Sequence, residues 1–488
     1  MLDIALLPEL PHMSTSFLRW AGILWLLHIV ILSFWVILQK RSPVATLGWI
    51  LTLAFIPYIG FLIFHFLGPH RLLRQRFKRL RAHTAITEHS EYLQYTVPAL
   101  KENQRTEDIL QISELIRNTT GFPLSTATSL ELMVDGRQTY PAILDAIAKA
   151  KHHVHLEYYI FEPDHIGTTL RDLLIRKARE GVEVRLLVDG LGSPNLKRSF
   201  IDPMTDAGIE FAYFHKPRLQ SVIRPMVNFR THRKIVICDG DIGFTGGLNI
   251  TDDEDERIHP TTAYHDIHIK VEGNAVHWLQ MIFIEDWFYV TNSHIRSKRH
   301  YFPIHETGEF PAQIVPSGPD NPWEIIHRTY VAIIQKAEHR IWLTTPYFVP
   351  TEPALLTLSN AALRGVDVRL LVPKRSDSRL VTFAARSYFE DLTKAGVKIW
   401  EYDERMLHSK TIVVDQDYSL IGTANFDTRS FRLNFEVCLA TYGPALADLL
   451  AEQFLKDIRS ATPVPKDRRI GFCGKLCESV ARLFSPLL

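Results

Sequence analysis

The 488-residue sequence has little cysteine and almost no net charge. Its four cysteines, Cys238, Cys438, Cys473 and Cys477, are too few for a disulfide scaffold, and they form neither a CxxC motif nor a zinc-binding Cys/His pattern. The 55 Lys and Arg residues are balanced by 54 Asp and Glu residues, which argues against a nucleic-acid coat protein. Hydrophobic residues make up 46% of the chain, and this excludes disorder as its main state.

Acidic residues are nearly absent from the N-terminal part of the chain. Residues 1–83 contain nine Lys and Arg but only Asp3 and Glu9, a net charge of +7. The remaining residues contain 46 Lys and Arg against 52 Asp and Glu, a net charge of −6. The sequence therefore joins a basic head to an acidic body.

Two runs in the basic head lack charged residues altogether, namely residues 20–38 and residues 44–67. Nineteen helical residues span about 28 Å, close to the hydrocarbon thickness of a bilayer. The runs predict a transmembrane hairpin, and a buried core helix or a cleaved signal peptide are the weaker alternatives. Six cations at 71–81 outnumber the two in the turn, which places both termini in the cytoplasm.

The acidic body contains an internal repeat. Residues 149–164 resemble residues 336–351, and residues 178–190 resemble residues 362–374. Each copy reads as an apolar strand, a helix, a Gly turn and a second apolar strand, typical of βαβ units. The period of about 180 residues indicates a duplicated α/β domain. A polar connector with a helix near 107–117 precedes it.

Both copies contain the motif H-x-K-x4-D followed by G-x2-N. The five matching positions are separated by 176 residues in every case, and they are His232, Lys234, Asp239, Gly246 and Asn249 in the first copy and His408, Lys410, Asp415, Gly422 and Asn425 in the second. A single HxK triplet has little meaning, but two copies with matching tails in a duplicated chain indicate a functional site.

Histidine and lysine two residues apart on a strand share one face. If the two copies meet face to face, two imidazoles and two ammonium groups converge on one pocket. The lysines would neutralise a phosphodiester, and Asn249 and Asn425 would donate hydrogen bonds to it. One imidazole could attack phosphorus while the other protonates the leaving alkoxide, so no metal or other cofactor is required.

The carboxylates leave more than one interpretation open. Asp239 and Asp415 lie at odd separations from the lysines, so a turn or supporting role is as plausible as direct chemistry. Asp266 and Glu436 follow the two motifs and could fix the tautomers of the imidazoles, although ordinary ion pairs are the alternative.

These motifs resemble the phospholipase D superfamily, and within it the bacterial cardiolipin synthases of the phospholipase D type. Residues 422–437, the stretch 271–276 and the ending 481–488 support the closer resemblance. It implies catalytic roles for His232, Lys234, Asp239, His408, Lys410 and Asp415. It further implies His232 as the nucleophile and His408 as the acid and base, with Glu436 behind His232 and Asp266 behind His408.

The resemblance implies two phospholipase D-like α/β lobes with pseudo-two-fold symmetry behind a transmembrane hairpin. We expect an N-terminal tail at 1–16, the hairpin at 17–67, a basic juxtamembrane segment and linker at 68–118, lobe 1 at 119–300, lobe 2 at 301–462, and a C-terminal tail at 463–488. The tail is expected to form an amphipathic helix, on the bilayer or on the protein's own body.

The implied reaction transfers a phosphatidyl group between two phosphatidylglycerols in a bacterial cytoplasmic membrane, with the catalytic body in the cytoplasm. The oligomeric state stays open. Rival readings are a phospholipase D-type hydrolase, a transphosphatidylase with another lipid acceptor, and an inactive scaffold. A nuclease is disfavoured because the body is acidic. Tyr264, where the family has Trp, and the acidic stretch 252–256 depart from the family pattern near the site, and they leave the acceptor lipid open.

Overall fold

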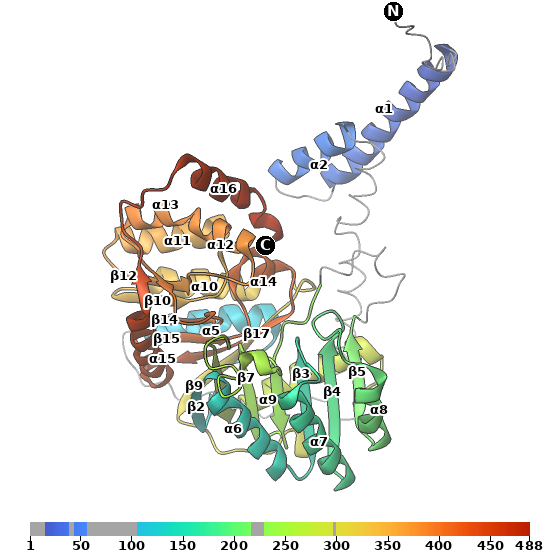
Figure 1. Cartoon of the computed structure of the whole chain (residues 1–488), viewed down its shortest axis with the longest axis vertical. Coiled ribbons are helices and arrows are strands. Elements are labelled where there is room, and N and C mark those ends of the chain that lie inside the picture. The colour runs from blue at the N-terminus through green and yellow to red at the C-terminus, as the bar shows by residue number, and fades with distance from the viewer. Residues whose placement is uncertain (1–14, 39–42, 56–104, 216–228, 296–298) are drawn as a thin grey trace, which may run out of the picture. The chain divides into compact units, whose positions relative to one another are not determined.

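The computed structural model describes residues 15–38, 43–55, 105–215, 229–295 and 299–488 (Figure 1). All but the last residue of the predicted turn at 39–43, the end of the second uncharged run and the basic segment at 71–81 lie outside these residues, as do residues 1–14. The chain divides into two compact units, and both lobes belong to the second unit.

The described part of the first unit consists of helices α1 (Thr15–Leu38) and α2 (Pro43–Phe55). They share a small core in which Leu32, Val36 and Leu53 are buried against Trp49. Other large apolar side chains of α1 are exposed, among them Trp20 at 66% and Phe34 at 64%. Among the described residues, no helix combines the length and the hydropathy needed to span a bilayer.

Lobe 1 is built on a mixed seven-stranded sheet with the strand order β2-β8-β7-β6-β3-β4-β5. The strands β3, β4 and β5 are parallel to one another, and the other pairings are antiparallel. The bounds are β2 (Ser129–Val134), β3 (His153–Tyr158), β4 (Glu183–Asp189), β5 (Glu210–Phe214), β6 (Ile235–Cys238), β7 (Ile242–Gly246) and β8 (Ile267–Glu272).

Lobe 2 repeats this order as β9-β17-β15-β14-β10-β12-β13, with β1 and β18 added at the two edges. The predicted duplicated α/β fold is therefore confirmed. The bounds are β1 (Ser125–Ala127), β9 (Phe310–Ser317), β10 (Arg340–Thr344), β12 (Asp367–Pro373), β13 (Lys398–Tyr402), β14 (Thr411–Val414), β15 (Tyr418–Gly422), β17 (Glu436–Tyr442) and β18 (Ala461–Pro463). A separate short pair joins β11 (Phe348–Val349) to β16 (Phe426–Asp427).

Helices cover the outer face of each sheet, and others fill the space between the sheets (Figure 1). The outer helices of lobe 1 are α6 (Asp135–Lys149), α7 (His165–Arg179) and α8 (Arg198–Asp206). Those of lobe 2 are α10 (Ile325–Lys336), α11 (Glu352–Leu363), α12 (Arg379–Arg386) and α13 (Phe389–Ala395). The helices α9 (Val276–Thr291) and α15 (Pro444–Asp457) share one core with strands of both lobes.

The sequence of α9 explains its central place. Thirteen of its sixteen residues are buried, including Trp278, Phe283 and Trp287. A helix whose apolar side chains are spread around all of its sides has no face for water and must be enclosed. Because this helix packs against both sheets, it ties the two lobes into one hydrophobic core.

The structure groups the connector and the residues just after it with lobe 2, although lobe 1 was expected to begin at residue 119. Helix α5 (Thr106–Thr120), near the predicted helix at 107–117, buries Ile109, Ile112 and Ile116 in the core of lobe 2. Strand β1 then pairs antiparallel with β9, although it lies in the range expected for lobe 1. Residues 106–127 therefore belong physically to lobe 2.

Near the C-terminus, α16 (Phe472–Leu483) packs on α12, with a charged side chain buried and large apolar side chains exposed. Glu478 is buried and pairs with Arg468 at 2.5 Å, while Phe472 is 81% and Leu483 is 78% exposed. The predicted tail helix is present and docks on the protein's own body, yet its outer face is apolar.

A buried ion network also crosses between the lobes. His265 lies 2.8 Å from Asp135 of lobe 1 and 3.0 Å from Asp457 of lobe 2. Arg405 of lobe 2 pairs with Asp135 at 2.5 Å. Although burial lowers the pKa of His265, the two carboxylates outweigh it and raise the pKa to about 10.

We predict that His265→Asn lowers the free energy of unfolding by about 3 kcal/mol at pH 6, the usual cost of removing one partner of a buried ion pair. Because the folded pKa exceeds the unfolded value, this stabilisation is complete below about pH 6.5 and is lost as the pH rises towards 10. Chemical denaturation at both ends of this range measures it. The exposed His259→Asn is the control, and equal stability of both variants at pH 6 would contradict the prediction.

Candidate active site

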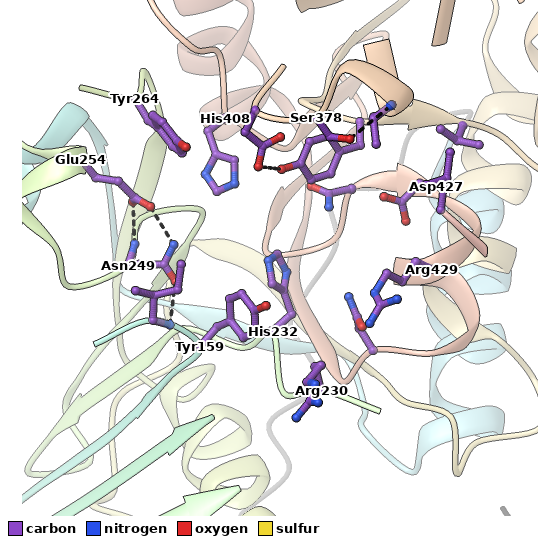
Figure 2. Close-up of a pocket in the computed structure, with 18 residues that line it drawn as sticks. Tyr159, Arg230, His232, Asn249, Glu254, Tyr264, Ser378, His408, Asp427 and Arg429 are labelled. Atoms are coloured by element: carbon purple, nitrogen blue, oxygen red, sulfur yellow. Dashed lines mark hydrogen bonds between the residues drawn. The ribbon is translucent and has the colours of Figure 1, made fainter. Parts of the chain in front are cut away.

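Both motif histidines line one cavity between the lobes, with a volume of about 420 Å³ (Figure 2). His232 lies just before β6 and His408 just before β14, so the HxK triplets are extended segments leading into the strands and not part of them. Asn249 and Asn425 line the same cavity. Lys234 and Lys410 are almost fully buried beside it. The structure thus brings together both histidines, both lysines and both asparagines.

Backbone hydrogen bonds between the lobes set the positions of the histidines. The amide of His232 donates to the carbonyl of Phe435 at 2.9 Å, and the amide of His408 donates to the carbonyl of His265 at 2.7 Å. These bonds belong to two isolated parallel bridges, Thr231 with Phe435 and His265 with Leu407. In each bridge, the segment before one histidine runs beside the segment that leads to a carboxylate of the other lobe.

As a result, each imidazole contacts a carboxylate from the opposite lobe. His232 Nδ1 lies 3.0 Å from Glu436 Oε2, and His408 Nδ1 lies 2.6 Å from Asp266 Oδ2. These are the two contacts that the resemblance implied. Since Nδ1 is engaged in both rings, Nε2 is the nitrogen left for the cavity.

Further donors hold the Glu436 carboxylate in place. Thr423 Oγ1 donates to Glu436 Oε2 at 2.6 Å, and Ser430 Oγ and Asn434 Nδ2 donate to Oε1 at 2.9 and 3.2 Å. Burial raises the pKa of Glu436, but His232 and these hydrogen bonds bring it below its ordinary value. The carboxylate is therefore a fixed negative charge behind the ring of His232.

Burial and the two lysines disfavour the charged form of both imidazoles. Burial lowers the pKa of His232 and lowers that of His408 strongly, and the neighbouring Lys234 and Lys410 act in the same direction. Burial and the charge of Lys410 lower the pKa of Lys234 to about 7. Burial raises the pKa of Asp266 to about 6. A neutral imidazole has a free lone pair, which nucleophilic attack requires.

Each lysine lies close to its own histidine. Lys234 Nζ donates to the carbonyl of His232 at 3.0 Å, and Lys410 Nζ donates to that of His408. Lys234 Nζ is 5.5 Å from the centre of the Tyr159 ring, which also packs edge-on against the imidazole of His232. The two side chains of the first triplet therefore share one side, as the spacing predicts.

The two asparagines differ in their hydrogen bonds. Asn249 Nδ2 donates to Glu254 at 2.7 Å, and its Oδ1 accepts from the amide of Ile160 at 3.1 Å. The Oδ1 atom of Asn425 is buried and has no hydrogen-bond partner within the described part of the chain. Since Oδ1 can only accept, a hydrogen bond from Asn425 to a phosphoryl oxygen would come from its Nδ2.

Asp239 and Asp415 do not line the cavity. Each lies at the far end of its strand, in the left-handed region with φ of 56° and 52°, and accepts three backbone N–H groups at 2.7–2.9 Å. The donors are Lys151, His152 and His153 for Asp239, and Glu338, His339 and Arg340 for Asp415. The third motif residue therefore holds the turn that leads into β3 or β10, the supporting role left open by the sequence.

Several polar residues of the cavity were not predicted from the sequence, among them two arginines and a glutamate. Arg230 and Arg429 lie on the side of His232, and Glu254 lies on the side of His408 (Figure 2). Glu254 was signalled only as part of the unusually acidic stretch 252–256. Neither arginine belongs to the repeated motif.

Within the described ranges of the chain, one group of side chains has the geometry to hold a metal ion. Donor atoms of Glu254, Asp266 and His408 lie within 4.8 Å of one another. The same carboxylates lie in the electrostatic range of Lys234 and Lys410, however, and Asp266 is already bound to the His408 ring. Two ammonium groups beside the cluster oppose a divalent cation, so we assign no step to a metal.

We predict that Asp239→Asn lowers the free energy of unfolding by about 2–3 kcal/mol, because a charged acceptor of three amides is lost. Burial raises the pKa of Asp239, but these amides bring it below 3.8. The stabilisation is thus present above pH 3.8 and declines in more acidic solution. Thermal and urea denaturation would measure it, with the exposed Asp206→Asn as control. Full stability together with lost activity would instead give Asp239 a chemical role.

Comparison with known proteins agrees with this geometry. A family model described as "Cardiolipin synthase, PLD-like domain" matches residues 143–287 and 330–458, more than half of the chain. A second model, "Phospholipase_D-nuclease N-terminal", matches residues 28–69.

Individual relatives match over nearly the whole chain. The chain is 39% identical to a cardiolipin synthase of Geobacillus thermodenitrificans, over 94% of this chain and 92% of that protein. It is also 39% identical to cardiolipin synthase 1 of Bacillus anthracis, over 99% and 97% of the two chains. The crystal structure of phosphatidylserine synthase from Haemophilus influenzae shares the fold, with a TM-score of 0.56, 14% identity and coverage of 77% of this chain and 98% of that one. This chain belongs to the phospholipase D-like cardiolipin synthase family.

Proposed function

We propose that the protein is a cardiolipin synthase, which transfers a phosphatidyl group from one phosphatidylglycerol to another and releases glycerol. The observation that carries this proposal is the pair of buried imidazoles in one cavity, each with a carboxylate on Nδ1. The comparisons support phosphatidyl transfer, since curated relatives that match nearly the whole chain carry this name.

In the first half of the reaction, Nε2 of His232 attacks the phosphorus of the donor lipid. The negative charge of the bound phosphodiester favours the protonated form of His408. The P–O bond to the glycerol headgroup breaks as the P–N bond forms, and protonated His408 gives the proton on Nε2 to the leaving oxygen. Glu436 stabilises the positive charge that develops on the ring of His232. Lys234, Lys410 and Asn425 stabilise the charge on the phosphoryl oxygens.

In the second half, a hydroxyl of another phosphatidylglycerol attacks the phosphatidyl-histidine. His408 takes its proton as the P–O bond forms and the P–N bond breaks, so His408 acts as base after acting as acid. Asp266 holds the ring of His408 in one orientation in both steps. Both half-reactions use the same residues, and the enzyme returns to its starting protonation state.

We predict that His232→Ala and His408→Ala each lower cardiolipin formation at least about 1,000-fold. Glu436→Gln should lower it less, by about 100-fold, because the nucleophile remains. Labelled phosphatidylglycerol and product chromatography measure the rates. Cardiolipin with glycerol supports transfer, whereas phosphatidic acid alone would indicate a hydrolase and no turnover a scaffold. Substantial cardiolipin synthesis by either His variant would contradict the proposal that both histidines form one catalytic site.

We further propose that the N-terminal hairpin anchors the protein in the cytoplasmic membrane. The uncharged runs at 20–38 and 44–67 and the exposed apolar side chains of α1 support this proposal. The six cations at 71–81 favour a catalytic body on the cytoplasmic side, beside anionic lipid headgroups.

This topology predicts the labelling of the native cysteines. Cys473 and Cys477 are exposed on the body, while Cys238 and Cys438 are buried. A membrane-impermeant maleimide should label the protein in permeabilised cells but not in intact spheroplasts. A Cys473→Ser, Cys477→Ser double variant is the control that must lose the label. Labelling in intact spheroplasts would place the body outside the cytoplasm.

A further inference from the structure

Glu254 is a buried carboxylate that the transfer mechanism does not use. It is 2% exposed, and its two oxygens accept hydrogen bonds from the backbone amide and the side-chain amide of Asn249, each at 2.7 Å. This fork fixes the carboxylate on the wall of the cavity (Figure 2). Burial raises the pKa of Glu254, while the nearby His408 lowers it.

The two lobes are related by pseudo-two-fold symmetry, but Glu254 of lobe 1 has no acidic counterpart in lobe 2. The offset of 176 residues that relates the motifs relates Glu254 to Ser430. Ser430 Oγ accepts from the amide of Asn425, as Glu254 accepts from that of Asn249. At this position lobe 1 therefore has a carboxylate where lobe 2 has a neutral hydroxyl. A negative charge repels a phosphodiester, so phosphate binding does not explain it.

The two ends of the cavity differ in chemistry. At the end of His408, the ring of Tyr264 lies 5.4 Å from the imidazole, and burial and the charges of Asp377 and Glu254 raise its pKa to about 12. At the end of His232 are Arg230 and Arg429 (Figure 2). Both ends have a carboxylate and a phenol, namely Glu254 with Tyr264 at one end and Asp427 with Tyr159 at the other. The His232 end adds two guanidinium groups, which favour anionic groups.

The geometry of phosphoryl transfer determines which part of the lipid lies at each end of the cavity. In an in-line displacement, the nucleophile and the leaving group lie on opposite sides of phosphorus. With His232 as nucleophile and His408 as acid, the leaving glycerol departs on the side of His408. The attacking hydroxyl must arrive from the same side, since His408 is also its base. A glycerol group therefore lies beside Glu254 in both half-reactions.

We propose that Glu254 is the main ligand of a hydroxyl-binding subsite, which holds the glycerol headgroup of the leaving and the attacking lipid at the His408 end of the cavity. This inference rests on the proposed function. Glu254 accepts a hydrogen bond from a headgroup hydroxyl other than the one that reacts, and Tyr264 covers the subsite. Water has no second hydroxyl to bind there, so the subsite favours transfer over hydrolysis.

The experiment measures how the phosphatidyl-histidine partitions between two attackers. The full-length protein acts on phosphatidylglycerol in mixed micelles with labelled glycerol. Attack by an alcohol gives labelled phosphatidylglycerol or cardiolipin, and attack by water gives phosphatidic acid. The hydroxyl proton goes to His408 in either case, and the P–N bond breaks as a P–O bond forms. The readout is the ratio of alcohol products to phosphatidic acid.

We expect Glu254→Ala to lower this ratio about tenfold, the effect of about one hydrogen bond, and Glu254→Gln to lower it less because an acceptor oxygen remains. Since both products come from the same enzyme molecules, a lower yield of folded protein does not alter the ratio. Asp253→Asn, on the exposed neighbour in the same turn, is the matched control and should keep the wild-type ratio.

An unchanged ratio of alcohol products to phosphatidic acid in Glu254→Ala would contradict the proposed hydroxyl-binding subsite. A second arm replaces glycerol with ethanolamine, whose ammonium group a carboxylate also attracts. If the variant loses transfer to ethanolamine but keeps transfer to glycerol, the hydroxyl assignment is wrong. A wild-type protein that forms only phosphatidic acid under all conditions would instead refute the proposed synthase activity, so the two failures are distinguishable.

Discussion

The active site depends on two short backbone bridges between the lobes. Thr231 pairs with Phe435 and His265 with Leu407. In both cases the residue after one partner is a motif histidine, and the residue after the other partner is the carboxylate for that histidine. Because backbone hydrogen bonds fix both strands, the contacts of 3.0 and 2.6 Å follow from the pairing and need no additional adjustment of side chains.

The cost of burying these charges is shared across the interface. Lys234, Lys410, Glu436, Asp266 and Glu254 are all nearly inaccessible to water. Single buried charges are strongly unfavourable, but here each lies in the field of opposite charges from both lobes. The lobes must therefore associate before the charges are compensated. The shared core around α9 supplies the apolar contacts for that association.

Much of this arrangement could be predicted from the sequence, because duplication leaves a periodic signal. The offset of 176 residues identified both histidines, lysines and asparagines, and the βαβ pattern identified the two sheets. Glu254 escaped because its counterpart is Ser430, so no repeat marks it. Strand β1 escaped because three residues at a sheet edge carry no pattern. The resemblance, and not the spacing, paired each histidine with its carboxylate, since only the fold brings together residues 204 and 142 positions apart.

The placement of Asp239 and Asp415 changes how sequences of this kind are judged. The third residue of the motif supports a turn through three amides and lies away from the cavity. A related sequence that lacks this aspartate is thus not necessarily inactive, provided that another residue holds the turn. Conversely, an intact motif does not guarantee activity, because Asp266 and Glu436 lie outside it. Degenerate family members are better recognised by the loss of a histidine or of its partner carboxylate in the opposite lobe.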